Sequence, residues 1–244
     1  MTEIKFQFDP NLRKIIKNKK QVAVIPVGSI EQHGPHLPIS TDSEIVTEIS
    51  RKLSEKKNFL LLPTITYGVS FEHRPFFNLS IKESTLRTII TDLCTSLLAN
   101  NIKTVFVING HYGNLKSLKD IDVKLQKISK NKLRVFPLSY WHFMHREFDH
   151  AGFVETSLML AISKNVKMKS AEKGLVTDGM NQQQINILGR LAAKSFPKVT
   201  KNGIWGDPRK ATKREGQIIL DEIMRNLEKK CQTYLTGHSS KLHQ

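Results

Sequence analysis

Short apolar runs alternate with longer amphipathic segments along most of this chain, and this alternation constrains the fold more than any other feature. The apolar runs are VAVIPVGS (22–29), FLLLPTITYG (59–68), KTVFVING (103–110) and RVFPLSYW (134–141). Segments with apolar residues at helical spacing follow them at 42–57, 81–101, 115–129 and 155–163. Buried parallel strands are nearly continuous apolar runs, and their alternation with helices is typical of a parallel sheet. We therefore predict an α/β fold in which helices cover both faces of a mainly parallel sheet.

The size and composition of the chain favour one globular domain. Its 244 residues can bury a sizeable core, and we expect a single domain over 1–244 with a loose polar tail at 236–244. No apolar run approaches the roughly 18 residues that a membrane span needs. Residues 1–20 lack the apolar core of a secretory signal, so we expect a cytoplasmic protein. The two cysteines, Cys94 and Cys231, lie far apart, so any metal should be bound by oxygen and imidazole ligands.

The chain carries a formal net charge of +16, which raises the question of an acidic partner. Its basic residues are mostly lysines spread along the chain, as in KNKK, RKLSEKK and KISKNKLR. Scattered lysines on amphipathic helices usually form a solvated face, and we do not expect nucleic-acid binding as a primary role. The excess of positive charge remains compatible with a small anionic substrate. If the protein is not an enzyme, the alternative is a binding module for nucleic acid or a small molecule that retains an enzyme-like scaffold.

Metal-binding side chains follow each of the four predicted strands. In parallel sheets, ligands bind at the carboxyl ends of the strands, so the loops that follow these strands should meet at one edge. The side chains gathered there would be Glu31, His33, Asp42, Glu72, His73, His111, His150 and Glu155. This convergence is the strongest functional signal in the sequence.

The residue types in these loops point to a hydrolytic metal site. Carboxylates and neutral imidazoles with open coordination positions are the ligands that such sites use, and they suit zinc, manganese or iron. Glu31 and His33 are two residues apart and would share a face of an extended segment. Asp42 comes from the start of a helix, where it or Ser43 could also cap the helix. With a Glu/His pair on one side and His111 on the other, Asp42 could bridge two cations about 3.5–4 Å apart.

Other residues in these segments have structural explanations of similar weight. His36, beside prolines, is more often a hydrogen-bonded structural histidine than a ligand, and we place His142 and His145 on a helix face outside the metal site. Glu72 and His73 could be ligands or structural residues. Five aromatic residues could line a substrate pocket: Tyr67, Phe71, Tyr112, Trp141 and Trp205. Packing in the core explains an aromatic residue equally well.

Four motifs together resemble the creatininase family of metal-dependent hydrolases. They are GSIEQHGPHLPISTD (28–42), NGHYGN (109–114), HAGFVETS (150–157) and GIWGDPRKATKREG (203–216), and they occur in the family's order. The resemblance spans about residues 22–220. It implies a three-layer αβα sandwich, a centre with two divalent cations, hydrolysis of an amide C–N bond, and a homo-oligomer such as a hexamer.

The resemblance also implies roles for individual residues. Glu31 and His33 would each bind one cation, Asp42 would bridge both, and His111 would complete the first site. His150 would match a histidine that transfers a proton near the substrate. Glu155 would be a ligand or a carboxylate that supports the ligands.

One position departs from creatininase proper. Where that enzyme has a metal-binding glutamate two residues after the NGH histidine, this chain has Gly113, so Glu155 could supply the missing carboxylate. Other branches resemble the chain at least as well, namely the archaeal formamidopyrimidine-nucleotide deformylases of flavin and deazaflavin biosynthesis and the mycofactocin-precursor peptidases.

The sequence therefore predicts an amidohydrolase that cleaves a formamide, a cyclic amide or a peptide-like bond. A water activated by metal would attack the carbonyl carbon. His150, oriented by Asp149 or by a backbone carbonyl, would donate a proton to the leaving nitrogen.

Overall fold

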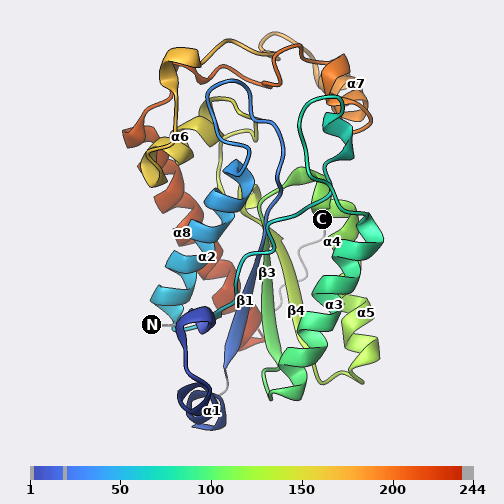
Figure 1. Ribbon diagram of the computed structural model, residues 1–244, viewed down its shortest axis with the longest axis vertical. Coiled ribbons are helices and arrows are strands. Elements are labelled where there is room, and N and C mark those ends of the chain that lie inside the picture. The colour runs from blue at the N-terminus through green and yellow to red at the C-terminus, as the bar shows by residue number, and fades with distance from the viewer. Residues whose placement is uncertain (1–2, 19–20, 238–244) are drawn as a thin grey trace.

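A four-stranded parallel sheet lies at the centre of the computed structural model, which describes residues 3–18 and 21–237 (Figure 1). The strands are β1 (Val22–Val27), β2 (Leu60–Leu61), β3 (Thr104–Asn109) and β4 (Arg134–Ser139). They are arranged in the order β2-β1-β3-β4, and each neighbouring pair is parallel. The predicted parallel sheet is confirmed, and its central strands β1 and β3 are almost entirely buried.

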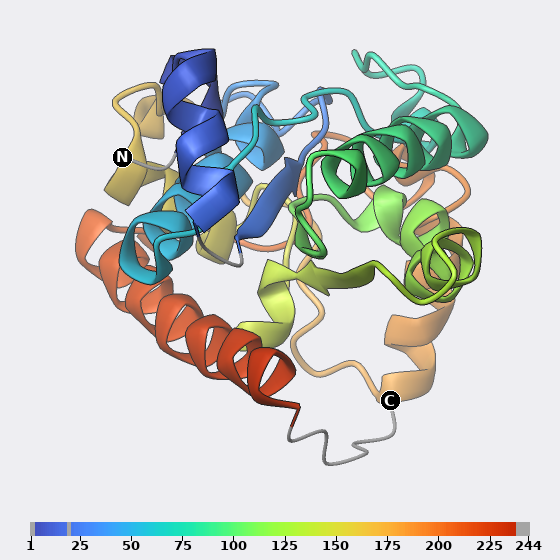
Figure 2. The ribbon, with the colours of Figure 1, turned by 90° about the horizontal axis from the view of Figure 1, so that it is seen from below.

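Helices cover both faces of this sheet. One face carries α2 (Thr41–Lys57), α6 (Phe153–Ile162) and α8 (Lys213–Thr236), and the other carries α3 (Glu83–Ala99), α4 (Leu115–Leu118) and α5 (Ile121–Ile128), with α1 (Asp9–Asn18) packed near its edge. Figure 1 shows the two groups of helices on opposite sides of the strands, and Figure 2 shows the same layers from below.

Successive side chains of the strands point to opposite faces of the sheet and so form the two hydrophobic cores between the layers. In β3, Phe106 and Ile108 pack with α2, α6 and α8, whereas Val105 and Val107 pack with α3 and α5. Successive strand residues point to opposite faces, so one buried strand supplies both cores. The α/β, three-layer αβα prediction is confirmed.

Two predicted elements differ from the structure. The expected strand at 59–68 is reduced to β2. After the bond from the Leu62 amide to the Val24 carbonyl, Pro26 of β1 has no amide hydrogen with which to continue the ladder. Pairing resumes at Ile65, which forms a bridge with Val27. The expected helix at 115–129 is divided into α4 and α5 by Asp120, which has a φ of 55°, a conformation that Asp tolerates better than most residues.

The start of α2 also differs from the expected capping. Ser40 is the N-cap residue and makes no side-chain cap bond. Ser43 donates instead to the Ser29 carbonyl at 3.0 Å, and Asp42 turns toward the loops at the end of the sheet. The side chains of Asp42 and Ser43, in the first turn of this helix, therefore contact the loops at the end of the sheet and do not cap the helix amides.

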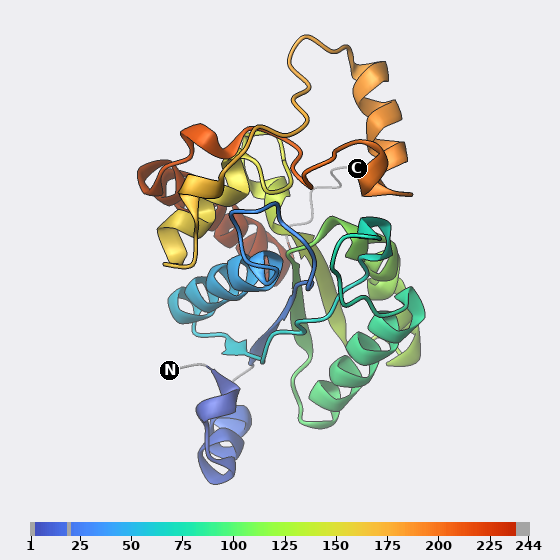
Figure 3. The ribbon, with the colours of Figure 1, turned by 45° about the horizontal axis from the view of Figure 1, so that its top comes forward.

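The segment between α6 and α8 rises above the carboxyl ends of the strands (Figure 3). It contains α7 (Gln182–Ala192) and was not assigned from the sequence. Short 3-10 helices occupy Ile4–Phe6, Phe71–His73, Tyr112–Asn114, Tyr140–Phe143, Met168–Ser170, Phe196–Lys198 and Pro208–Lys210.

Two sequence predictions concern the membrane and the tail. Within residues 3–18 and 21–237, none of the helices combines the length and the apolarity required to cross a bilayer. The helix α8 continues to Thr236, and most of the tail predicted to be loose, 238–244, lies outside the described residues.

Candidate metal centre

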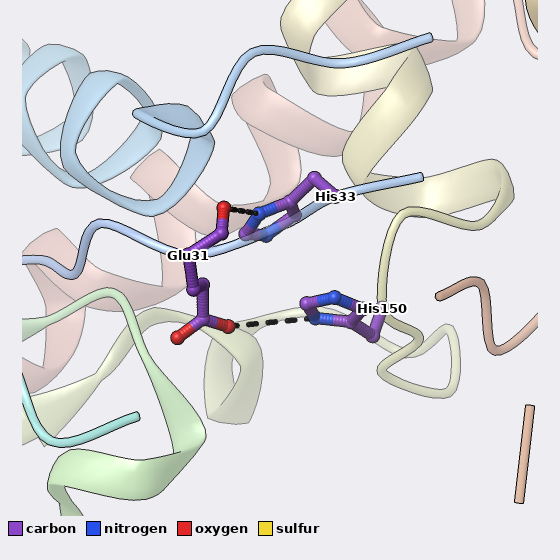
Figure 4. A group of neighbouring side chains, drawn as sticks. All are labelled: Glu31, His33 and His150. Carbon is purple, nitrogen blue, oxygen red and sulfur yellow. Dashed lines mark hydrogen bonds and ion pairs between the residues drawn. The ribbon is translucent and has the colours of Figure 1, made fainter. Parts of the chain in front are cut away.

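Glu31 and His33 lie in the loop that leaves β1, and both are buried at the carboxyl end of the sheet (Figure 4). The loop is held by a hydrogen bond from the Glu31 amide to the Ile39 carbonyl at 3.0 Å. Ser29 Oγ donates to Glu31 Oε2 at 3.0 Å, and His33 Nδ1 lies 3.1 Å from the Glu31 carbonyl oxygen. When Nδ1 donates to that carbonyl, the Nε2 lone pair is left available for a cation, which is the usual arrangement around metal-binding histidines.

Asp42 lies between two imidazoles that come from different loops. Its Oδ1 is 3.2 Å from His33 Nε2, and its Oδ2 is 3.1 Å from His111 Nδ1. The first turn of α2 presents Asp42, and the end of β3 presents His111. The two oxygens of one carboxylate therefore face two separate ligand sets, as the sequence predicted for a bridging residue.

Glu155 completes the set around His33. Its Oε2 is 3.5 Å from His33 Nε2 and accepts a hydrogen bond from the Ala151 amide at 2.7 Å. Tyr140 donates to the other oxygen at 3.4 Å. Glu155 is completely buried in the first turn of α6, so these contacts fix its orientation.

His150 reaches the centre from the loop before α6, as Figure 4 shows. Its Nδ1 lies 3.8 Å from Glu31 Oε1, and its Nε2 lies 3.0 Å from the backbone carbonyl of Gln32. Asp149 instead accepts hydrogen bonds from the amides of Val154 and Glu155 at the start of α6. Of the two orienting groups considered from the sequence, the structure selects the backbone carbonyl.

Glu72 and His73 also enter the centre, from the 3-10 helix at 71–73. His73 Nε2 is 3.1 Å from Glu31 Oε1, and Glu72 Oε1 is 3.6 Å from His111 Nε2. All eight side chains predicted to converge at this edge are thus brought together.

The donor atoms of this cluster fit divalent cations. Three sets of potential ligand atoms lie within 4.8 Å of one another: Glu31, Asp42 and His111; His33, Asp42 and Glu155; and Glu31, His33 and His150. Three buried atoms of the cluster, Glu31 Oε1, His33 Nε2 and Asp42 Oδ2, make no hydrogen bond. A buried polar atom without a partner is costly, and a cation at these atoms would remove that cost.

The electrostatics of the cluster show why charge must be neutralised there. Burial lowers the pKa of His33, but the carboxylates of Asp42 and Glu155 outweigh burial and raise it to about 10. Burial raises the pKa of Glu155 to about 8. The pKa of His150 is well below its usual value because of burial and the nearby charge of His33. The carboxylates therefore attract protons or cations, while His150 stays a neutral imidazole.

A cavity of about 220 Å³ opens onto these groups. Aromatic side chains from four segments form its walls, namely Tyr112, Phe148, Phe196 and Trp205. Gly189, Ala192 and Ala193 of α7 and the turn after it form another wall. Drug-sized ligands usually occupy about 300–1,000 Å³, so this cavity suits a small molecule or one end of a longer substrate.

Residues 9–231 match the family described as "Creatininase: Creatinine amidohydrolase". The chain belongs to the creatininase family. It is 32% identical over 213 residues to a mycofactocin precursor peptide peptidase from Mycobacterium ulcerans, covering 82% of this chain and 80% of that protein. It is 27% identical over 220 residues to a 2-amino-5-formylamino-6-ribosylaminopyrimidin-4(3H)-one 5'-monophosphate deformylase from Methanocaldococcus infernus, covering 88% and 89% of the two chains.

The fold agrees with this assignment. A solved structure described as creatininase Mn superposes with a TM-score of 0.79 over 94% of this chain and 96% of that chain, at 20% identity. The family resemblance inferred from the four motifs is confirmed, and the chain is a creatininase-family amidohydrolase.

The creatininase-like motif NGHYGN has a local reason for its glycine. A Cβ atom at Gly113 would lie 2.1 Å from the Val69 carbonyl oxygen, 2.5 Å from His111 Nε2 and 2.7 Å from Glu72 Oε1. The space for a side chain at this position is already filled by the segment 69–72. The glutamate of creatininase proper therefore has no room here, and Glu72 contributes a carboxylate to the same region.

Several candidate residues lie outside the centre. His36 is buried with its Nε2 2.8 Å from Thr156 Oγ1, and His145 is exposed near Glu222, as expected for histidines outside the site. His142 lies in the 3-10 helix at 140–143, outside the cavity wall.

The predicted aromatic set divides in two. Tyr112 and Trp205 line the cavity, whereas Trp141 is buried in the core and Tyr67 and Phe71 are exposed away from the wall. Sequence reasoning missed Phe148 and Phe196 in the wall and Gln32 beside the histidines. The position of Gln32 between Glu31 and His33 was the available signal, while no local pattern distinguishes Phe196.

Proposed function

We propose that the chain hydrolyses an amide C–N bond at a centre of two divalent cations. Glu31, Asp42 and His111 would hold the first cation, and His33, Asp42 and Glu155 would hold the second. Zinc, iron and manganese all accept this set of oxygen and nitrogen donors. The observation that carries the proposal is the placement of Asp42, whose two oxygens face His33 at 3.2 Å and His111 at 3.1 Å.

The chain's own groups supply the proton transfers of the proposed reaction. When bound, two divalent cations polarise an amide carbonyl and lower the pKa of water. His150 is a neutral imidazole with its Nδ1 facing the centre at 3.8 Å from Glu31 Oε1, so it can accept a proton as water attacks. It then returns the proton to the nitrogen that leaves the carbonyl carbon. Glu155, held by the Ala151 amide, binds a cation and keeps the ligand set in place.

The cavity wall favours an uncharged substrate with an apolar or aromatic group. Five carboxyl side chains line the cavity, whereas no lysine or arginine does so among the described residues. Phosphate recognition in proteins relies strongly on arginine and lysine, so a phosphorylated substrate would find no partner besides the cations. The net charge of +16 is therefore carried by other parts of the chain. A peptide-like or cyclic amide fits this wall better than a phosphorylated formamide does.

Metal analysis tests the centre directly. We expect about two divalent cations per subunit in the wild-type protein and almost none in Asp42→Ala, because both ligand sets share this residue. Asp122→Asn, an exposed carboxylate on α5, is the matched control and should retain the full complement. Retention of both cations by Asp42→Ala would contradict the bridging role.

A substrate panel tests the reaction and its selectivity. We expect hydrolysis of formamides, lactams or short peptides by the metal-loaded protein, loss of activity with a chelator, and recovery when the metal is restored. Within a matched pair of substrates, adding a phosphate should lower kcat/KM at least about tenfold, because about 1.4 kcal/mol of lost interaction gives that ratio. Preference for the phosphorylated member would refute the selectivity argument.

We also propose the finer properties that the sequence and the family resemblance predict. They are a single catalytic domain over 1–244 with its core at about 22–220, a cytoplasmic location and a homo-oligomer such as a hexamer. Cys94 and Cys231 are buried free thiols, which supports a reducing compartment. Exposed apolar side chains near the centre, such as Phe71, Phe77 and Leu79, support an interface between copies. Light scattering of the purified protein tests the assembly.

A further inference from the structure

The side-chain amide of Gln32 lies between two histidines of the centre. Its Nε2 is 3.0 Å from His73 Nδ1, 3.0 Å from His150 Nε2 and 3.1 Å from the Gly203 carbonyl oxygen. These three groups come from three segments that are 41 to 171 residues distant from Gln32 in the sequence. One amide group therefore connects the loop after β1 with each of them.

Counting hydrogens assigns the protons of both imidazoles. His150 Nε2 also lies 3.0 Å from the Gln32 carbonyl oxygen, which can only accept, so Nε2 carries the hydrogen and donates it there. The amide of Gln32 has two hydrogens, which then go to His73 Nδ1 and the Gly203 carbonyl. His150 is left with a lone pair on Nδ1, the atom that faces Glu31 Oε1 at 3.8 Å.

The same assignment fixes the second histidine. Because His73 Nδ1 accepts a hydrogen bond from Gln32, its Nε2 carries the hydrogen, and this atom faces Glu31 Oε1 at 3.1 Å. The hydrogen of His73 is therefore on the side of the ring that faces Glu31, without forming a hydrogen bond to Oε1, and the lone pair of His150 Nδ1 faces the same carboxylate end. The two rings, 4.9 Å apart, have opposite roles: the Gln32 side chain determines that of His73, and the Gln32 backbone carbonyl determines that of His150.

The surroundings of Gln32 hold its amide in one orientation. Its Oε1 accepts a hydrogen bond from the Gly34 amide at 3.0 Å, which distinguishes the oxygen from the nitrogen. Gly203 has a φ of 74°, and a Cβ there would lie 1.8 Å from Gln32 Oε1. Gly203 therefore meets two requirements, a left-handed backbone and space for the Gln32 side chain.

We propose that Gln32 is a positioning residue: its side-chain amide sets the tautomer of His73, and its backbone carbonyl sets that of His150, leaving the His150 Nδ1 lone pair ready to accept a proton. This inference rests on the proposed amide hydrolysis. In that reaction the water O–H bond breaks as the C–O bond forms, the proton passes through His150 Nδ1, and it joins the nitrogen as the C–N bond breaks. Gln32 touches none of the reacting atoms and acts through the histidines.

The test compares Gln32→Glu, which keeps the shape but removes both amide hydrogens, with Gln32→Ala. We expect kcat to fall about 10- to 100-fold in each variant, below the full 10²–10⁴-fold of a lost acid–base group, while KM stays within about threefold. Metal content should remain that of the wild type. Gln217→Ala, on the exposed side of α8, is the matched control and should leave kcat unchanged.

Nitrogen-15 NMR of the histidine rings in zinc-loaded protein gives a readout independent of activity. We expect His73 protonated on Nε2 in the wild type and a mixture of His73 tautomers in both variants. His150 should keep its Nε2 hydrogen in all three proteins, because the backbone carbonyl of residue 32 remains. If the wild type hydrolyses no amide but the tautomers change as expected, the proposed function fails and the positioning role stands. An unchanged kcat, an effect on KM alone, loss of metal in both variants, or identical His73 tautomers in wild type and variants would overturn it.

A double-mutant cycle checks the part assigned to Gly203. Gly203→Ala alone introduces both the backbone strain and the clash with Gln32 Oε1, whereas in a Gln32→Ala background only the strain remains. We expect the decrease in melting temperature caused by Gly203→Ala to be several degrees smaller in the Gln32→Ala background than in the wild type. The effects of mutations at residues in contact are not additive. Equal losses in the two backgrounds would overturn this assignment.

Discussion

Replacing Gly113 by alanine tests whether the segment 69–72 closes the space beside His111. The added Cβ would lie 2.1 Å from the Val69 carbonyl oxygen, 2.5 Å from His111 Nε2 and 2.7 Å from Glu72 Oε1. Overpacking of this kind typically costs about 1–3 kcal/mol. Because one of the three atoms belongs to the backbone and cannot rotate away, we expect a loss of about 3 kcal/mol in the free energy of unfolding, near the upper end of that range.

The loss can be measured by thermal and urea denaturation. For a chain of this size, about 3 kcal/mol corresponds to a decrease of about 6–12 °C in the melting temperature. The displaced His111 ring should also weaken binding of the first cation about tenfold, as disturbed supporting contacts do in metal sites. Metal titration of the variant measures this second effect.

Gly189→Ala provides the matched control. Gly189 lies inside α7 and has open space around its Cβ position, so alanine should stabilise the protein by about 0.5–1 kcal/mol. A Gly113→Ala protein as stable as the wild type, with unchanged metal affinity, would refute the reasoning that this space is filled.

Three further predictions concern the centre. His150→Ala should lower kcat by about 10²–10⁴-fold with normal metal content, because it removes the proton acceptor; full activity of the metal-loaded variant would exclude this role. Glu155→Gln should weaken the second cation by about 10- to 100-fold and spare the one at His111, which metal titration would show as one tight and one weak site; two equally tight sites would place Glu155 outside the ligand set. Chelation should lower the melting temperature by about 10–20 °C, because each of the two cations contributes about 2.7 kcal/mol at 100 times its Kd, and an unchanged melting temperature would argue against buried cations.

The layered fold and the edge of the sheet that bears the centre could be predicted from the sequence. Apolar runs such as 103–110 must be buried on both faces, and parallel strands place their following loops at one edge. The chemical types in those loops then indicated a metal site. The division of the helix at Asp120 could not be predicted, because no proline or glycine marks that position and the left-handed conformation is held by the packing of α4 and α5 against the sheet.

The orientation of side chains within the loops could not be predicted from the sequence. Asp42 could have capped α2 and Asp149 could have oriented His150, since both options satisfy the same local spacing. The structure places Asp42 between His33 and His111 and leaves Asp149 to cap α6. The choice depends on which backbone amides and carbonyls other segments bring within reach.

By itself, the order of residues determined that this chain forms helices around a parallel sheet and that carboxylates and imidazoles gather at one end of it. Those properties follow from periodicity and from ligand chemistry, which are local. Only the tertiary structure decided that Gln32 lies between two histidines, that Glu72 occupies the space beside Gly113, and that aromatic rings rather than lysines line the cavity. Such contacts join residues that are distant in sequence, and the packing of whole segments fixes them.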